Sequence, residues 1–148
     1  MTNYGRRLVI DANFEGTVGV VCQAIRDEGL QALAQTDLCQ HFWSHLSRDL
    51  RRYTLIDAWS PDLAFEAVHL DLEAGTMFPT RFAIYELADG ETVVTATEPM
   101  APLADEPGWR EHAPALARIA DRERERIAHV FDRLTSRELR RETADSAA

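Results

Sequence analysis

The chain has 148 residues, of which 45% are hydrophobic and 28% charged, a composition typical of one soluble globular domain. Its formal net charge is −9, and all 16 of its basic residues are arginine. The acidic balance disfavours nucleic-acid binding, and the absence of lysine excludes a lysine Schiff base or a P-loop lysine in this chain. No apolar run approaches the roughly 18 residues of a membrane span, so we expect no membrane partner. Because of the acidic charge, we also expect no nucleic-acid partner.

Two cysteines, Cys22 and Cys39, are too few for the disulfide framework of a small secreted domain. The N-terminal segment MTNYGRRLVIDANF contains arginines but lacks the apolar run of a secretory signal. We therefore expect the two thiols to be reduced, and we expect the protein to be cytoplasmic.

Hydrophobic periodicity divides the chain into strands and helices. Val18, Val21 and Ile25 share one face of the first predicted helix, and Gly29 is placed to end it. The pair Asp89–Gly90 lies between two β-rich segments and predicts a hairpin. In chain order, the predicted elements are strand 6–12, helix 15–28, strand 30–37, helix 38–47, strand 51–59, helix 61–72, strands 81–87 and 91–98, and helix 110–139.

This β-α-β-α-β-α-β-β-α order predicts one α+β domain over residues 1–140, followed by a frayed C-terminal tail at 141–148. The late hairpin favours a mixed or antiparallel sheet in a sandwich with helices packed on one face. Such a sheet leaves its other face or an edge free, so we expect a homodimer.

Four blocks of the chain carry a family resemblance. They are EGLQALAQTD (28–37), LIDAWSPDLAFEAV (55–68), FPTRFAIYE (78–86) and TVVTATEP (92–99). In their order and spacing, rather than in any one specific motif, they resemble the domain-of-unknown-function 302 family. The resemblance extends over roughly residues 8 to 132.

The chain departs from the family pattern at two places. The family has Cys-Asn-Pro where residues 59–61 are Trp-Ser-Pro, and Leu-Pro-Cys-Asn where residues 78–81 are Phe-Pro-Thr-Arg. No thiol chemistry at those positions therefore carries over to this chain. The resemblance implies a compact α+β fold, often dimeric, with no established enzymatic reaction, and haem binding in some branches.

The segment LCQHFWSHL (38–46) is the one place where metal-binding residue types gather. On a helix of about 100° per residue, its apolar side chains form one arc, with His41 and His45 side by side on the edge. Cys39 lies roughly 120–160° round the helix from the histidines, so it cannot share a tetrahedral zinc ion with them. Phe42 also replaces the Glu of the zinc-protease motif, so zinc is disfavoured.

Haem requires less: one imidazole nitrogen, an apolar slot and cations for the propionates. We expect a small-molecule ligand, haem b, with His45 as the axial and hence metal ligand and His41 as its substitute. Gas binding or a redox role would then depend on the sixth position of the iron. The other predicted contacts are Arg48 and Arg52 for the propionates, and Phe42, Trp43, Trp59 and Met77 for the slot.

The alternative is a cofactor-free structural or interaction domain that acts through its dimer surface. In that interpretation, His41 and His45 lie at the boundary between core and solvent, and the neighbouring arginines form a solvated loop. The residues by themselves leave the two interpretations open.

Motifs for catalysis are not visible in the sequence. There is no Gly-x-Ser-x-Gly elbow and no glycine loop for phosphate, so a non-enzymatic role is favoured. An enzyme that acts on a small anionic substrate through the arginines stays open. The alternating charges of DRERERIAH (121–129) indicate a salt-bridged, solvent-exposed face of the last helix.

Overall fold

The computed structural model describes residues 5–103 and 105–147. Within them, an antiparallel sheet of five strands has the order β1-β5-β4-β3-β2, which makes β1 and β2 its edges. The predicted α+β fold and its order of elements are confirmed. The elements are β1 (Gly5–Asp11), α1 (Phe14–Asp27), β2 (Gln31–Asp37), α2 (Leu38–Leu46), β3 (Tyr53–Trp59), α3 (Pro61–Leu70), η1 (Leu72–Met77), β4 (Thr80–Ala88), β5 (Glu91–Thr97), η2 (Ala101–Leu103), α4 (Trp109–His112) and α5 (Pro114–Ala147).

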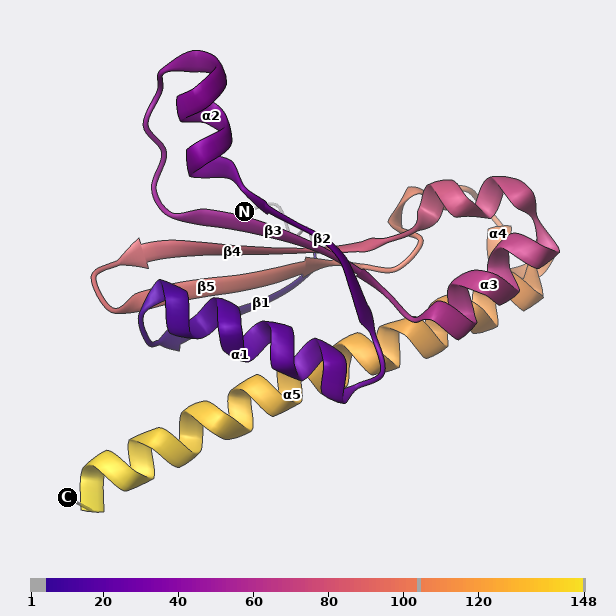
Figure 1. Cartoon of the computed structure of the whole chain (residues 1–148). Helices are drawn as coiled ribbons and strands as arrows, with labels where there is room; N and C mark the ends of the chain where they lie inside the picture. The colour runs from indigo at the N-terminus through magenta and orange to yellow at the C-terminus, as the bar shows by residue number, and fades with distance from the viewer. Residues whose placement is uncertain (1–4, 104, 148) are drawn as a thin grey trace.

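Two helices, α1 and α5, lie together across one face of the sheet (Figure 1). Phe82 and Ile84 of β4 are fully buried beneath them, against Val21 and Ile25 of α1. Phe131 of α5 stacks on Phe82 with 6.2 Å between the ring centroids. The main core therefore lies between the sheet and these two helices, as the predicted two-layer arrangement requires.

Local sequence signals set the boundaries of these elements. The Asn13 side chain accepts a hydrogen bond from the Gly16 N–H at 2.7 Å and caps α1. Gly29 follows α1 with a φ of 79°, a left-handed conformation that glycine adopts without a Cβ clash. The predicted hairpin is also present, with a turn at Asp89–Gly90 between β4 and β5.

The last helix differs from the prediction at both ends. Residues Trp109–His112 form the separate short helix α4, and α5 begins at Pro114, whose missing N–H is tolerated in a first turn. α5 then continues to Ala147 and so includes residues 141–147, which we expected to fray. No glycine or proline interrupts the helix there. Ala148 lies outside the described residues.

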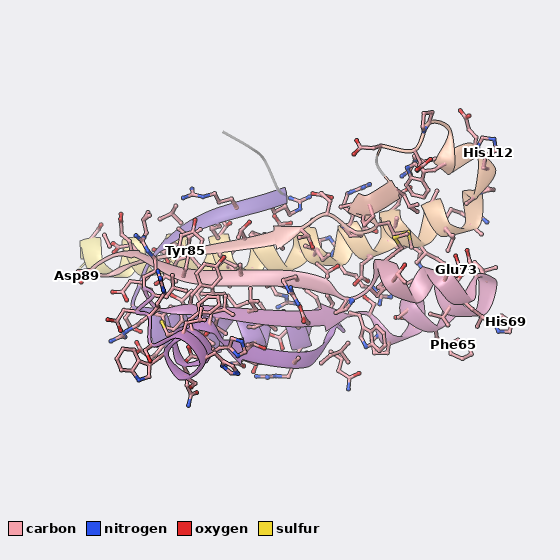
Figure 2. All side chains as sticks on the ribbon, turned by 90° about the horizontal axis from the view of Figure 1, so that it is seen from above. Phe65, His69, Glu73, Tyr85, Asp89 and His112 are labelled. Carbon is pink, nitrogen blue, oxygen red and sulfur yellow. The ribbon has the colours of Figure 1, made fainter. Side chains whose placement is uncertain are left out.

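The other face of the sheet is not covered by α1 or α5 (Figure 1). Tyr85 points to this face because it alternates with the buried Ile84, and it stacks on Tyr53 with 5.3 Å between the centroids. Figure 2 shows Tyr85 near one end of the molecule and Phe65 and His112 near the other. No helix among the described residues is long and apolar enough to cross a bilayer.

Candidate functional site

The predicted histidine pair lies in a projecting segment, the β2–α2 arm, which we define as residues 31–50. Every residue of the edge strand β2 is exposed. α2 follows directly, contains no buried residue, and rises on the side of the sheet away from α1 and α5 (Figure 1). The arm is therefore attached to the domain mainly through the ladder between β2 and β3.

The sequence of the arm explains where α2 begins and ends. The Asp37 carboxylate accepts a hydrogen bond from the Gln40 N–H at 3.1 Å and caps the helix. Ser47 ends it in the left-handed conformation, with a φ of 51°. The Cys39 thiol donates to the carbonyl oxygens of residues 50–51 at 2.9 and 2.8 Å, and so ties the helix to the segment that returns to β3.

His41 and His45 lie one turn apart and their rings stack, with centroids 4.3 Å apart. Nδ1 of His45 lies 2.9 Å from the carbonyl oxygen of His41. Because a carbonyl oxygen only accepts, Nδ1 carries the hydrogen, and the neutral ring keeps its lone pair on Nε2. Both histidines are exposed, so they lie on a solvent-facing helix rather than at the edge of a core.

Apolar side chains of α2 surround this pair without burying it. Phe42 is half-buried and presents an edge to the His41 ring, with 5.9 Å between the centroids. Trp43 is 58% exposed and Leu46 is 60% exposed. Neither the two cavities beside α1 and α5 nor the cavity beside η1 is lined by a residue of α2. Leu38 and Phe42 of the apolar arc are therefore only partly buried, and Trp43 and Leu46 are left exposed.

The two predicted propionate ligands differ in their surroundings. Arg52 forms ion pairs with Glu15 of α1 and with Glu86 of β4, so its charge is already compensated. Arg48 is exposed in the loop after α2, and no ion pair joins it to a described residue. Of the two, Arg48 is the guanidinium that remains available to an anionic group.

Trp59 and Met77 are not brought together with the histidines. Within the β2–β3 ladder, Trp59 pairs with Gln31, whereas Thr54 pairs with Asp37 beside α2. Trp59 therefore lies at the opposite end of β3 from α2 and its histidines. Met77 ends η1 and packs against a second core cluster, which lies beyond that end of β3. This cluster consists of Leu63, Ala67, Ala74, Met100, Ile119 and Ala120. One chain thus does not assemble the predicted haem slot.

A buried carboxyl group was missed by our sequence analysis. Glu123 of α5 is fully buried, and its Oε1 accepts a hydrogen bond from the Ser60 N–H at 3.3 Å. It belongs to the run 121–129, whose charged residues we expected to form a salt-bridged, solvent-exposed face. The signal is its spacing, since Glu123 lies four residues from Ile119 and from Ile127, and both of these are buried.

The rest of that run does form ion pairs at the surface. Arg124 contacts Asp121 and Glu98, and Arg126 contacts Asp62 through two hydrogen bonds of 2.7 and 2.8 Å. The prediction of a salt-bridged face is therefore right for these residues and wrong for the buried carboxyl group among them.

Most of the chain matches a known family: the model described as domain of unknown function DUF302 matches residues 7–134. The chain belongs to the DUF302 family. No match was found among the curated proteins.

A solved structure supports the same fold for this DUF302 domain. It is the crystal structure of an uncharacterized conserved DUF302 protein from Bacillus stearothermophilus, with a TM-score of 0.75 and 18% sequence identity. The match covers 90% of this chain and 99% of the other. At this identity the similarity establishes the fold.

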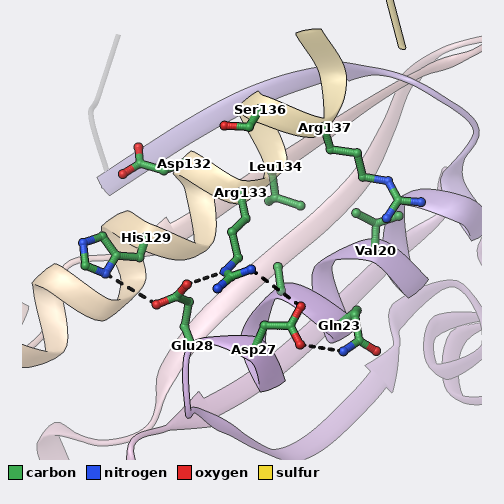
Figure 3. A pocket seen from close by; sticks show the side chains of 11 residues that line it. Val20, Gln23, Asp27, Glu28, His129, Asp132, Arg133, Leu134, Ser136 and Arg137 are labelled. Carbon is green, nitrogen blue, oxygen red and sulfur yellow. Dashed lines mark hydrogen bonds and ion pairs between the residues drawn. The ribbon is translucent and has the colours of Figure 1, made fainter. Parts of the chain in front are cut away.

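The DUF302 domain also has a charged cavity of about 440 Å³ between α1 and α5 (Figure 3). Glu28, whose side chain is only 16% exposed, forms ion pairs with His129 and Arg133. Asp27 accepts a hydrogen bond from Gln23 at 2.7 Å. Asp27, Glu28, His129 and Arg133 therefore compensate one another within the cavity wall, which Asp132 and Arg137 also line.

Proposed function

We propose that this DUF302 protein acts as a homodimeric interaction module whose contact surface is the β2–α2 arm. The observation that carries the proposal is the complete exposure of β2, an edge strand with one side of its backbone unpaired in the sheet. A free strand edge is a template for pairing with another strand. Leu33, Trp43 and Leu46 add exposed apolar surface to the same arm.

A second copy of the chain fits this edge better than a foreign strand does. Residues 32–36 (Ala-Leu-Ala-Gln-Thr) carry no charge, so two copies with a net charge of −9 each can meet there without direct repulsion. The stretch also lacks the lysine or proline that protects solitary edges. An antiparallel pairing of β2 with its symmetry mate uses the same residues from both chains, as a two-fold interface requires.

Sedimentation velocity over protein concentrations of about 1 to 100 μM tests this proposal. We expect the wild type to be a dimer and the variants Leu33→Glu and Trp43→Glu to be monomers. Phe65→Glu is the matched control, because Phe65 is 74% exposed but lies on α3, outside the arm. A monomeric wild type, or a control that dissociates as readily as the arm variants, contradicts the proposal.

As a second function, we propose that the dimer holds haem b through His45. The favouring observation is the hydrogen bond from His45 Nδ1 to the His41 carbonyl, which orients the ring and leaves Nε2 free for iron. The donor fits the group, but one chain supplies no slot around it. We therefore place haem against the apolar surface of α2 only where a second copy covers that surface, with Arg48 available to a propionate and His41 as substitute ligand.

Haem, when bound, would supply an iron for gas binding or redox chemistry. Titration with haem should give a Soret band that His45→Ala abolishes and His69→Ala retains. His69 is the matched control because it is exposed on α3 and its ring stacks on Phe65. The band should also be lost in Trp43→Glu. Absence of any spectral change in a wild-type dimer contradicts haem binding and leaves the dimer proposal intact.

The proposal also places the protein in the cytoplasm. Both Cys22 and Cys39 are free thiols in the structure, which suits a reducing compartment. Fractionation of cells that produce the protein with an intact N-terminus should recover it with soluble cytoplasmic markers, and recovery from another compartment would contradict this placement.

A further inference from the structure

A second cavity lies at the end of the molecule opposite the β4–β5 turn. It has a volume of about 430 Å³, within the usual range of small-ligand sites, and lies between η1, residues 100–103 and 106–109, α4 and the start of α5. Figure 2 shows two of its lining residues, Glu73 and His112, at that end of the molecule. It shares no residue with the β2–α2 arm.

One part of the cavity wall is apolar. Met77, Trp109 and Leu116 line it and are only partly buried, although they pack against the second core cluster. Met100 lines it as well and is only 2% exposed, with a φ of 56°. A left-handed conformation is unfavourable for a residue with a Cβ, and such strain is often found where a side chain is held in place for a ligand.

The other part of the wall is acidic. Asp71, Glu73 and Glu106 line the cavity, and no arginine does. Among the described residues, neither Glu73 nor Glu106 has an ion-pair partner. His112 also lines the cavity and is its basic lining residue among those described. Arg110, next to Trp109, lies over the Trp109 ring at 5.2 Å and is paired with Asp121.

We propose that this cavity binds a small organic cation with an apolar body. Its ammonium group lies against the carboxylates of Glu73 and Glu106, and its apolar part packs on Met77, Met100 and Trp109. An anion would be repelled by the carboxylates. A neutral apolar molecule would gain nothing from them, and a bare metal ion would gain nothing from the apolar wall. The proposal is independent of the arm and of dimer formation.

Isothermal titration of the full chain with three probes of the same apolar body tests the charge preference. The probes are 3-phenylpropylamine, 3-phenylpropanol and 3-phenylpropionate at pH 7.5. We expect the amine to bind most tightly, the alcohol more weakly and the carboxylate least. An amine that gives no binding, or that binds no better than the carboxylate, overturns the proposal.

Variants then locate the binding. In the double variant Glu73→Gln and Glu106→Gln, amine affinity should fall about five- to tenfold, the sum of two exposed charge interactions, while alcohol affinity stays unchanged. Glu125→Gln is the control, because Glu125 is an exposed carboxylate of α5 outside the cavity. Unchanged amine affinity in the double variant, or an equal loss in the control, overturns the proposal.

The position of the probe is checked independently by NMR. The indole N–H resonance of Trp109 should shift on addition of the amine, whereas that of Trp43 in the arm should not. The reverse pattern would place the amine on the arm and overturn the assignment to the cavity. The same titration with Trp43→Glu should be unaltered, which separates this proposal from the dimer proposal.

Discussion

Glu123 of α5 is fully buried, and its Oε1 accepts a hydrogen bond from the backbone N–H of Ser60, 3.3 Å away. Burial raises the pKa of this carboxyl group above its ordinary value of 4.5, against the lowering effects of Ser60 and Arg126. Ser60 lies between the last residue of β3 and the first residue of α3. The contact therefore joins the end of β3 and the start of α3 to the middle of α5.

We expect Glu123→Gln to stabilise the protein at neutral pH by about 1 kcal/mol, because an amide of the same shape carries no charge to bury. A raised pKa in the folded state means that this group's contribution is fully present below pH 4.5 and is lost as pH rises through the raised value. Urea unfolding of both proteins from pH 4 to pH 8 checks this. The wild type should lose stability relative to the variant as pH rises, and parallel pH profiles would contradict the assignment.

The neighbouring Asp62 should have the opposite pH dependence. Two hydrogen bonds from Arg126 lower its pKa from 3.8 to about 2. Its stabilisation is therefore present above pH 3.8 and is lost as pH falls towards 2. Because the Asp62 side chain is 56% exposed, we expect Asp62→Asn to cost at most about 1 kcal/mol at pH 7.

Unfolding of Asp62→Asn between pH 2 and pH 7 measures this difference. Glu66→Gln is the matched control, because Glu66 has a similar exposure of 52% and a single hydrogen bond of 3.1 Å to Arg122. The Asn variant should converge with the wild type at acid pH. A constant difference over the whole range would show that the ion pair with Arg126 does not cause the effect.

Core and arm aromatics should differ in their contribution to monomer stability. Phe82 is fully buried and stacks on Phe131, so Phe82→Ala should lower the free energy of unfolding by about 3–5 kcal/mol. Trp43 is 58% exposed, so Trp43→Ala should cost less than about 1 kcal/mol. Denaturant unfolding at low protein concentration provides the comparison. A large loss for Trp43→Ala would show that α2 packs within its own chain.

Strands and helices were predicted well because their signals are local. The Asp89–Gly90 turn, the Gly29 end of α1 and the apolar face of α1 depend on residues within one or two turns of each other. On that face, the predicted residues Val21 and Ile25 are indeed buried. The α2 helix itself was also predicted, together with the adjacency of its two histidines.

The positions of Trp59 and Met77 relative to the histidines were not predicted, because they depend on distances across the sheet. Trp59 is 14 residues from His45 in sequence, but it lies at the opposite end of β3, because the β2–β3 ladder runs antiparallel from Asp37 and Thr54 to Gln31 and Trp59. Composition and spacing contain no information about this register. The same holds for the apolar arc of α2, which has the pattern of a packed helix but leaves Trp43 and Leu46 exposed.

By itself, the sequence determined the order of elements, the two-layer α+β architecture, the family and the exclusion of lysine chemistry, because periodicity, turn residues and residue types are properties of the chain. The tertiary structure decided which polar groups are buried and which apolar ones are exposed. It buries Glu123 inside a run of surface charges, isolates the β2–α2 arm, and opens a cavity beside Met77. These outcomes follow from packing between distant segments, which no local pattern encodes.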